Sequence, residues 1–497
     1  MTSLTRADWE QRAKTLNIET RAFIHGEYVS AQSGATFECI SPVDGRVLGL
    51  VASCDQADAE RAVADARATF DSGVWSRMAP VARKEVMIRF ATLIEQHGEE
   101  LALLETLDMG KPIGDSLSID VSSAARSIRW SGEAIDKIYD EVAATPHNEL
   151  GLVTREPIGV VAAIVPWNFP LLMSCWKLGP ALSTGNSVIL KPSEKSPLTA
   201  IRLAQLAIDA GIPAGVFNVL PGFGHTVGKA LALHMDVDTL VFTGSTKIAK
   251  QLMIYAGESN MKRVWLEAGG KSPNIVFADA PDLQAAAEAA AGAIAFNQGE
   301  VCTAGSRLLV ENSIKAKFVP MVVAAIKAWK PGNPLDPETN VGALVDTQQM
   351  NTVLSYIQAG HDDGAKLVAG GKRTLEETGG VYVEPTIFDG VNNAMRIARE
   401  EIFGPVLSVI GFDSAEEAVQ IANDTPYGLA AAVWTSNLSK AHLTAKALRA
   451  GSVWVNQYDG GDMTAPFGGF KQSGNGRDKS LHAFDKYTEL KATWIKL

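Results

Sequence analysis

Cys302 is the residue of this chain with the clearest chemical potential. It stands in the segment Asn-Gln-Gly-Glu-Val-Cys-Thr-Ala-Gly, residues 297–305, far in the sequence from the other cysteines. A thiolate becomes a covalent catalyst when a base and an anion-stabilising donor accompany it. An isolated cysteine is also commonly a small, buried and inert side chain. The polar, glycine-punctuated setting favours the reactive interpretation.

Two other segments offer the partners that a nucleophilic cysteine needs. Glu267 lies just before the glycine pair at 269–270, and Asn168 lies between Pro166 and Pro170. A carboxylate can act as a general base, and a side-chain amide can donate a hydrogen bond to an oxyanion. Each alone could be ordinary structure, a solvated charge or a turn residue. Together with Cys302 they indicate covalent catalysis.

The elements that must position these residues read as alternating strands and helices. Short apolar runs at residues 160–165, 187–190, 217–220 and 239–242 are predicted strands, separated by helical segments such as 198–210. Such βαβ alternation predicts a parallel sheet and an α/β fold. A second α/β unit begins near 273–277 and continues to about 469. Before the first sheet, a hairpin at 23–29 and helices at 57–70, capped by Asp55, and at about 82–107 are expected.

Two predicted strands end in turns that suit a dinucleotide. The turns at 220–224 and 242–245 carry glycine or proline and lead into helical sequence. Backbone N–H groups at a helix N-terminus favour a pyrophosphate, so the pattern is Rossmann-like although it lacks a GxGxxG fingerprint. Each turn taken alone would be an ordinary α/β connection.

Composition limits the possible partners. The chain has 497 residues, 46% hydrophobic and 20% charged, with a net charge of −11. This length predicts two or three domains, and the negative charge argues against nucleic acid or an anionic membrane as partner. The apolar runs are too short to span a bilayer, and the charged N-terminal segment lacks a secretory pattern, so a cytoplasmic location is expected. Four scattered cysteines and eight scattered histidines predict neither a disulfide framework nor a metal site.

Over essentially its whole length the chain resembles the NAD(P)-dependent aldehyde dehydrogenases. Besides the Glu267 and Cys302 segments, the resemblance rests on ordered motifs at 105–112 (ETLDMGKP), 166–170 (PWNFP), 191–194 (KPSE), 242–246 (FTGST), 401–406 (EIFGPV) and 466–469 (PFGG). It implies a Rossmann-like NAD-binding domain (1–136 and 155–266), an α/β catalytic domain (267–470) and a small β oligomerisation extension (137–154 and 471–497). The extension would join subunits into a homodimer or homotetramer.

The resemblance also implies which residues hold the cofactor. They are Val165, Pro166, Trp167, Lys191, Ser193, Glu194, Gly224, Gly228, Phe242, Gly244, Ser245, Ile248, Gly269, Gln349, Glu401 and Phe403. Glu194 would accept hydrogen bonds from the adenosine ribose and repel a 2′-phosphate, which favours NAD. NADP use stays open, because a glutamate can rotate away while Lys191 remains cationic. Ala249 stands where related chains often have glycine, a small change that cofactor binding should survive.

The mechanism implied by the resemblance uses all three candidate catalytic residues. The Cys302 thiolate attacks an aldehyde carbon, and Asn168 with the Cys302 backbone N–H holds the oxyanion. Oxidation leaves a thioester, which water attacks with Glu267 as base. Relatives that transfer the acyl group to coenzyme A generally lack this base, so hydrolysis to a carboxylic acid is favoured over CoA acylation. A third alternative is a structural or binding member of the fold without turnover.

The predicted substrate tunnel leaves two classes of aldehyde open. By resemblance its lining is Phe169, Met173, Trp176, Val301, Thr303, Asp459 and Phe467, with Trp130 near the mouth. Asp459 and Asp462 would attract a cationic tail, and Gly461 leaves space where many relatives carry an aromatic residue. The aromatic walls would equally suit an arylacetaldehyde such as indole-3-acetaldehyde. The segment 471–480 most resembles the bacterial branch that oxidises γ-glutamylaminobutyraldehyde and 4-guanidinobutyraldehyde.

Overall fold

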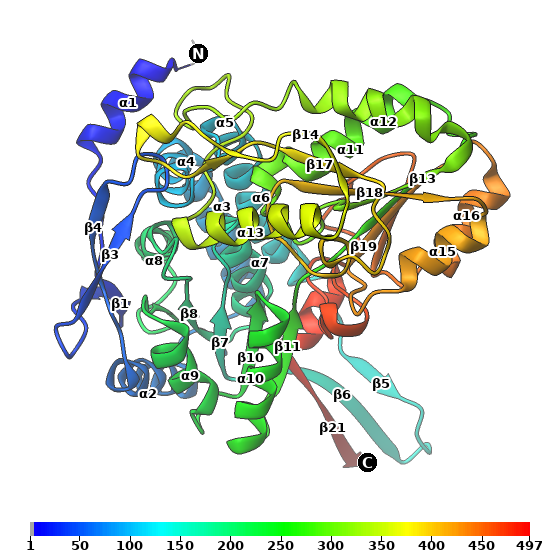
Figure 1. The fold of residues 1–497 in the computed structure, drawn as a ribbon. Helices are drawn as coiled ribbons and strands as arrows, with labels where there is room; N and C mark the ends of the chain where they lie inside the picture. Colours follow the sequence, from blue (N-terminus) through cyan, green and yellow to red (C-terminus); the bar gives the residue numbers. More distant parts are fainter. Residues whose placement is uncertain (1–3) are drawn as a thin grey trace.

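The first α/β unit is built on a seven-stranded sheet with helices on both faces (Figure 1). In spatial order its strands are β11 (Arg263–Glu267), β10 (Thr239–Thr243), β7 (Val160–Ile164), β8 (Ser187–Lys191), β9 (Phe217–Val219), β1 (Ala22–Ile24) and β2 (Glu27–Val29). The first five are parallel, and β1 and β2 form the antiparallel hairpin expected at 23–29. A computed structural model describes residues 4–497. It confirms the four predicted strands and their parallel pairing.

Side chains of this sheet alternate between two helical layers. Val161 and Ala163 face one apolar cluster, whereas Val160 and Ala162 face the other. The first layer contains α3 (Pro80–Gln96), α4 (Gly98–Met109), α6 (Ser122–Ala134), α7 (Pro170–Ser183) and α8 (Leu198–Ala210), and the second contains α2 (Gln56–Ser72), α9 (Lys229–Leu233) and α10 (Thr246–Glu258). Because both faces are covered, the central strands β7, β8 and β10 carry apolar residues on both faces instead of alternating with polar residues.

The expected helix at 82–107 is in fact two helices. His97, at φ −94° and ψ 17°, leaves the helical conformation, and Gly98 starts α4. A Cβ at Gly98 would lie 3.1 Å from Val121 Cγ1, so the small residue permits close packing at the break. Periodicity alone missed this break, because apolar residues continue on both sides of it. The cap of α2 by Asp55 is as predicted, with its side chain accepting from the Ala57 N–H.

The second α/β unit repeats the layered plan. Its strands are, in spatial order, β14 (Lys366–Ala369), β17 (Thr386–Asp389), β18 (Val406–Phe412), β13 (Arg307–Glu311), β12 (Pro273–Val276), β19 (Ala430–Trp434) and β20 (Ser452–Val455), all parallel except β14. Helices α11 (Leu283–Ala295) and α12 (Asn312–Ile326) cover one face, and α13 (Thr347–Asp362), α14 (Arg396–Arg399) and α15 (Ala415–Asn423) cover the other. Helix α16 (Leu438–Ala447) precedes β20.

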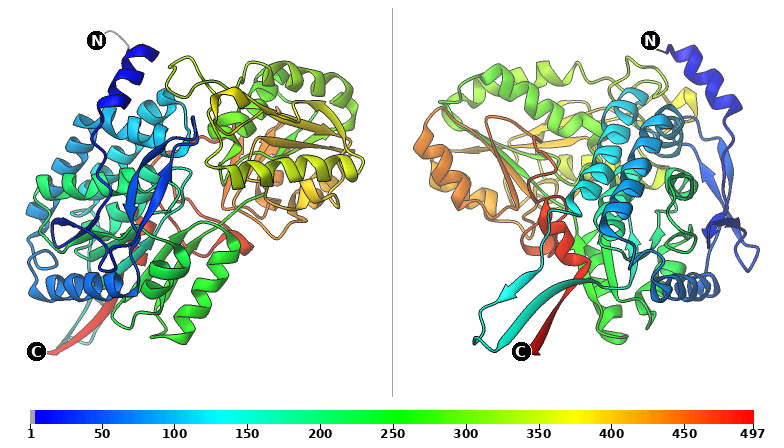
Figure 2. Two further views of the ribbon diagram at one scale, coloured as in Figure 1. Left: turned by 60° about the vertical axis from the view of Figure 1, so that its left-hand side comes forward. Right: turned by 180° about the vertical axis from the view of Figure 1, so that it is seen from behind.

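The two units lie side by side, and the C-terminal segment, in red, passes between them (Figure 2). Isolated bridges join Glu267 to Gly474 and Phe467 to Asp478. Other short elements are α1 (Arg6–Thr15), α5 (Ile113–Asp115) and the pairs β3 (Thr36–Ile40) with β4 (Val47–Ala52) and β15 (Arg373–Thr374) with β16 (Tyr382–Val383). The end of the chain is therefore in a position to complete a site between the units.

A separate three-stranded sheet projects from the body (Figure 1). It consists of β5 (Glu141–Ala143), β6 (Glu149–Pro157) and β21 (Thr488–Lys496), all antiparallel. The strand β6 extends three residues past the boundary expected at 154, because β21 continues to pair with it as far as Pro157. Leu490 and Trp494 are exposed on β21. The oligomerising role of this extension stays a prediction.

Candidate active site

A cavity of about 850 Å³ is lined by residues of both α/β units. Junctions between domains are common places for small-molecule sites. All three candidate catalytic residues line it, as do the cofactor candidates Pro166, Trp167, Gly244, Ser245, Gly269, Gln349, Glu401 and Phe403 and every predicted tunnel residue, Phe169, Met173, Trp176, Val301, Thr303, Asp459 and Phe467. Residues far apart in the sequence thus meet in one space.

The loop before Cys302 has an unusual backbone. Asn297 and Gln298 adopt φ of 46° and 57°, and Gly299 follows at 70°. Non-glycine residues in this region cost on the order of 1 kcal/mol each, so the surroundings must hold them. Asn297 Nδ2 donates to the Asn168 carbonyl at 3.1 Å, and Gln298 Oε1 accepts from the Gly342 N–H at 2.9 Å. Such maintained strain is typical of functional sites.

Glycines allow the Glu267 segment to touch the Cys302 loop. A Cβ at Gly270 would lie 2.4 Å from the Cys302 carbonyl oxygen, which is too close for any side chain. A Cβ at Gly269 would overlap the Glu401 carboxylate. Glu401 Oε1 in turn accepts from the Gly270 N–H at 3.0 Å. The glycine pair therefore brings Cys302, Glu267 and Glu401 to one place.

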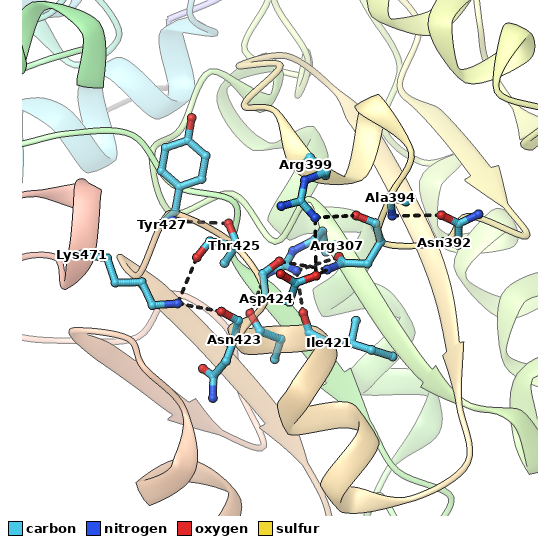
Figure 3. A network of polar contacts seen from close by, with 12 residues as sticks. Arg307, Asn392, Ala394, Arg399, Ile421, Asn423, Asp424, Thr425, Tyr427 and Lys471 are labelled. Carbon is cyan, nitrogen blue, oxygen red and sulfur yellow. Dashed lines mark hydrogen bonds and ion pairs between the residues drawn. The ribbon is translucent and has the colours of Figure 1, made fainter.

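Arg307, at the start of β13, is the centre of a network of polar contacts with the backbone of neighbouring segments (Figure 3). Its buried guanidinium donates to the carbonyls of Lys271 at 2.9 Å, Ile421 at 3.0 Å and Ala422 at 2.8 Å. Burial lowers the pKa of Arg307 to about 10, which leaves it charged at neutral pH. Nearby, Lys471 donates to the carbonyl of Asn423 at 2.7 Å. Charged donors thus fix the backbone at Lys271 and at the end of α15.

Two hydrogen-bond donors are available near the thiol. Asn168 is 4% exposed, and its Nδ2 donates to the Glu300 carbonyl at 2.8 Å, which leaves one of its two amide hydrogens for another acceptor. The Cys302 backbone N–H makes no hydrogen bond within residues 4–497. An amide side chain beside a free backbone N–H is the donor set of an oxyanion hole.

In the protein alone, burial disfavours the charged forms of both the Cys302 thiol and the Glu267 carboxyl group. Burial, with Glu401, Asp459 and Glu267 nearby, raises the pKa of Cys302 to about 12. Burial and Asp478 raise the pKa of Glu267 well above its ordinary value, although Lys177 and Lys486 oppose this. Neither carboxylate oxygen of Glu267 has a hydrogen-bond partner in the described part of the chain. Ionisation of Cys302 thus requires a base or a positive charge that arrives with a ligand.

The cofactor candidates gather where strands of the first sheet end. Lys191 ends β8, and its Nζ lies 3.2 Å from Glu194 Oε2. Ser245 caps α10, with its hydroxyl accepting from the Ile248 N–H at 3.4 Å. A Cβ at Gly224 would meet nothing within 4 Å, so open space lies beside that turn. An open edge with a helix N-terminus and a carboxylate fits a dinucleotide.

The other predicted cofactor residues fall into two groups. Val165, Ser193 and Phe242 lie at or near the ends of β7, β8 and β10, and Gly228 directly precedes α9, but none of these four residues lines the cavity. Gln349 lies instead beside the Glu401–Phe403 segment, where its amide donates to the Phe403 carbonyl at 2.7 Å. Phe403, at φ 55°, contacts the Trp167 ring at 5.2 Å.

Several lining residues escaped sequence reasoning: Ile119, Ser123, Leu172, Phe296, Trp454 and Lys479. Leu172 adjoins the predicted residue Met173 on α7, whereas Lys479 lies in irregular chain and was noted only as part of the segment 471–480. Trp130 is not part of the lining and instead lies 6.3 Å from the Phe484 ring. A Cβ at Gly461 would meet nothing within 4 Å, in agreement with the expected space.

Within residues 4–497 no group of three His, Cys, Asp or Glu could hold a metal ion, and no helix is long and apolar enough to cross a membrane.

Comparison with known proteins agrees with this geometry. The model of the aldehyde dehydrogenase family matches residues 28–493, and the chain belongs to that family. It is an NAD(P)-dependent oxidoreductase that acts on aldehydes.

Three similar proteins illustrate the range of this part of the family. NADP/NAD-dependent aldehyde dehydrogenase PuuC of Escherichia coli (strain K12) is 57% identical over 99% of this chain and 98% of its own. An indole-3-acetaldehyde dehydrogenase, whose crystal structure is of a complex with NAD+, has 84% sequence identity to this chain over the full length of both chains. The two structures superpose with a TM-score of 0.99. The gamma-glutamyl-gamma-aminobutyraldehyde dehydrogenase of Burkholderia cenocepacia J2315 is 63% identical over 99% of this chain and 100% of its own, with a TM-score of 0.98.

Proposed function

We propose that the chain converts an aldehyde to its carboxylic acid through a covalent intermediate on Cys302. The Cys302 thiol gives up its proton to water, the thiolate sulfur adds to the carbonyl carbon, and the oxyanion of the thiohemiacetal accepts from Asn168 and the Cys302 N–H. When bound, the dinucleotide supplies a cationic nicotinamide ring that accepts a hydride. Water then attacks the thioester, and Glu267 takes the proton of that water as the Cys302 thiolate leaves.

The observation that carries this proposal is the placement of Glu267. Its carboxyl group lies in the same cavity as Cys302, and neither of its oxygens is engaged by another described residue. A carboxylate without partners beside a thioester is suited to activate water, and this favours hydrolysis over transfer to coenzyme A. The intact set of Cys302, Glu267 and Asn168 also disfavours a non-catalytic member of the fold.

For the cofactor we propose NAD as the preferred form. Glu194 lies at the end of β8, where it would accept from ribose hydroxyls and repel a 2′-phosphate. Glu401 and Phe403 would hold the nicotinamide ribose, while Gly244 and Ser245 would meet the pyrophosphate at the start of α10. Lys191 lies within 3.2 Å of Glu194 and would still pair with a 2′-phosphate, so NADP use is expected to be weaker and not absent.

As the substrate we propose an amino- or guanidino-butyraldehyde. Asp459 and Asp462 line the cavity and would attract a cationic tail. The Burkholderia relative named for gamma-glutamyl-gamma-aminobutyraldehyde supports this class. The second candidate is an arylacetaldehyde such as indole-3-acetaldehyde, favoured by the rings of Phe169, Trp176 and Phe467 and by the relative named for that compound.

The test is NADH formation by the purified protein with 4-guanidinobutyraldehyde, hexanal and indole-3-acetaldehyde. A higher kcat/KM for the cationic aldehyde that disappears in Asp459→Asn supports the first class. A higher kcat/KM for the indole compound in both proteins rejects the first class in favour of the second. Absence of NADH formation with all three would overturn the proposal.

We further propose the domain limits 1–136 with 155–266, 267–470, and 137–154 with 471–497. The end of β11 at Glu267 supports the second limit.

We expect the β5–β6–β21 sheet to join subunits into a homodimer or homotetramer, because exposed apolar residues on β21 are suited to burial between copies. Sedimentation of the full chain and of a Trp494→Glu variant tests this oligomeric state.

A cytoplasmic location is supported by the need for a reduced Cys302 thiol, and cell fractionation tests it.

A further inference from the structure

The chain on either side of Cys302 has open space on two sides. Val301 and Thr303 line the active-site cavity, and together with Ala304 they also line a second cavity of about 250 Å³. Residues of α11 and Tyr458 are among the other walls of this second cavity. Protein interiors are otherwise closely packed, so a segment that lacks packing on two sides needs another restraint to keep its place.

The Tyr458 hydroxyl supplies such a restraint. It donates to the Thr303 carbonyl at 2.6 Å, and within residues 4–497 no other hydrogen bond reaches that carbonyl. Burial and the nearby Asp459 raise the pKa of Tyr458 well above its ordinary value, so the phenol keeps the hydrogen that it donates. The residue directly after the thiol is thus tied to a loop 155 positions later in the chain.

The loop that carries Tyr458 is itself held in place. Asn456, at φ 56°, accepts from the Thr435 N–H and donates to the Thr435 carbonyl, both at 3.0 Å. The centre of the Tyr458 ring lies 5.0 Å from that of the Trp454 ring. A Cβ at Gly305 would lie only 2.9 Å from the ring Cζ of Tyr458, so the ring packs directly on the backbone there. The hydroxyl is therefore presented by a ring that is fixed on several sides.

The residue that Tyr458 restrains acts on the thiol through its own N–H. Burial raises the pKa of Cys302 to about 12, whereas the Thr303 N–H, which donates to the sulfur, lowers it. A hydrogen bond to the charged form of a group favours that form. Because a residue has only two soft backbone torsions, fixing the Thr303 carbonyl limits how far the Thr303 N–H can turn away from the sulfur.

We propose that Tyr458 is a positioning residue for Cys302, whose hydroxyl holds Thr303 so that the Thr303 N–H stays directed at the thiolate. Tyr458 does not line the active-site cavity and acts only through the Thr303 backbone. The inference rests on the proposed function, in which Cys302 is the nucleophile, and adds a residue that the proposed mechanism does not use.

The experiment compares Tyr458→Phe with the wild-type full-length enzyme, because this change removes the hydroxyl and keeps the ring. Iodoacetamide alkylates Cys302 at a rate that mass spectrometry of the Cys302 peptide reports at one fixed pH. That rate should fall about three- to tenfold, the factor that loss of one hydrogen bond produces. The first-turnover rate of NADH formation from hexanal should fall by a similar factor, whereas the Kd for NAD should stay the same.

Tyr382→Phe is the matched control. The hydroxyl of the buried Tyr382 also donates to a backbone carbonyl, that of Val43 at 3.0 Å, and Tyr382 lines neither cavity. The control loses the same kind of hydrogen bond, so it should lose comparable stability. It should change neither the alkylation rate nor the first-turnover rate.

An alkylation rate that is unchanged or higher in Tyr458→Phe overturns the positioning role, as does an equal fall in Tyr382→Phe. If Tyr458→Phe does not fold, Gly305→Ala is used instead, because the added methyl group displaces the Tyr458 ring and its hydroxyl from Thr303, and the same criterion applies. Failure of the proposed function looks different. In that case the wild-type protein forms no NADH from any aldehyde, while the alkylation rates still decide the role of Tyr458.

Discussion

Replacing Asn168 with alanine should separate transition-state stabilisation from folding. The change removes the side-chain donor that we assign to the oxyanion, and loss of one such donor lowers the rate about 10²- to 10³-fold. It also removes the 2.8 Å hydrogen bond to the Glu300 carbonyl and leaves a small buried space. The free energy of unfolding should therefore fall by only about 1–2 kcal/mol. The loss of activity is thus expected to exceed greatly any loss from unfolded protein.

The assay is pre-steady-state NADH formation at saturating NAD, together with thermal unfolding. The rate of the first turnover should fall with Asn168→Ala while the affinity for NAD stays close to that of the wild type. A control is Asn218→Ala, since Asn218 is also buried, donates to the Gly215 carbonyl at 3.1 Å and accepts from the His25 N–H at 3.0 Å, but lies outside the cavity. It should lose comparable stability and little rate. A less than threefold fall for Asn168→Ala, or equal falls in both variants, would refute the assignment.

Three further predictions concern charge. Because the base form of Glu267 is deprotonated and burial and Asp478 raise its pKa well above the ordinary value, kcat should keep rising with pH above the range in which an ordinary glutamate ionises; a kcat that is flat above that range would contradict this. Asp459→Asn should lower kcat/KM for 4-guanidinobutyraldehyde about three- to tenfold relative to hexanal, as measured by initial rates; an equal effect on both aldehydes would remove Asp459 from tail binding. Glu194→Ala should raise the ratio of kcat/KM with NADP to that with NAD at least about tenfold, because Lys191 is freed to pair with the 2′-phosphate; an unchanged ratio would show that Glu194 does not discriminate.

Much of the fold could be predicted from the sequence. The buried parallel strands are short apolar runs with turn residues at their ends. Such runs predicted the bounds of β7, β8, β9 and β10 to within one or two residues. The helix α8 was predicted with the bounds that the structure shows. The break between α3 and α4 was missed, because apolar residues continue across His97 and the local backbone change depends on packing against Val121.

The residues of the candidate site could be predicted from the sequence only where they lie in distinctive motifs. Cys302, Glu267 and Asn168 lie in distinctive segments, and the structure brings all three to one cavity. The protonation states were not predictable, because they depend on burial and on Asp478, a residue more than 200 positions away from Glu267. The place of Lys479 in the substrate wall likewise depends on a loop whose path is set by long-range backbone hydrogen bonds to Phe467 and Met463.

The central claim is that a thioester forms on Cys302 and that Glu267 hydrolyses it. The most direct test is a single-turnover experiment with Glu267→Gln, in which NADH release and the intact mass of the protein are followed together. The account predicts a burst close to one NADH per active site, very slow turnover afterwards and an acyl mass increase that maps to Cys302. Sustained turnover at the wild-type rate, or a burst without an acyl group on Cys302, would contradict it.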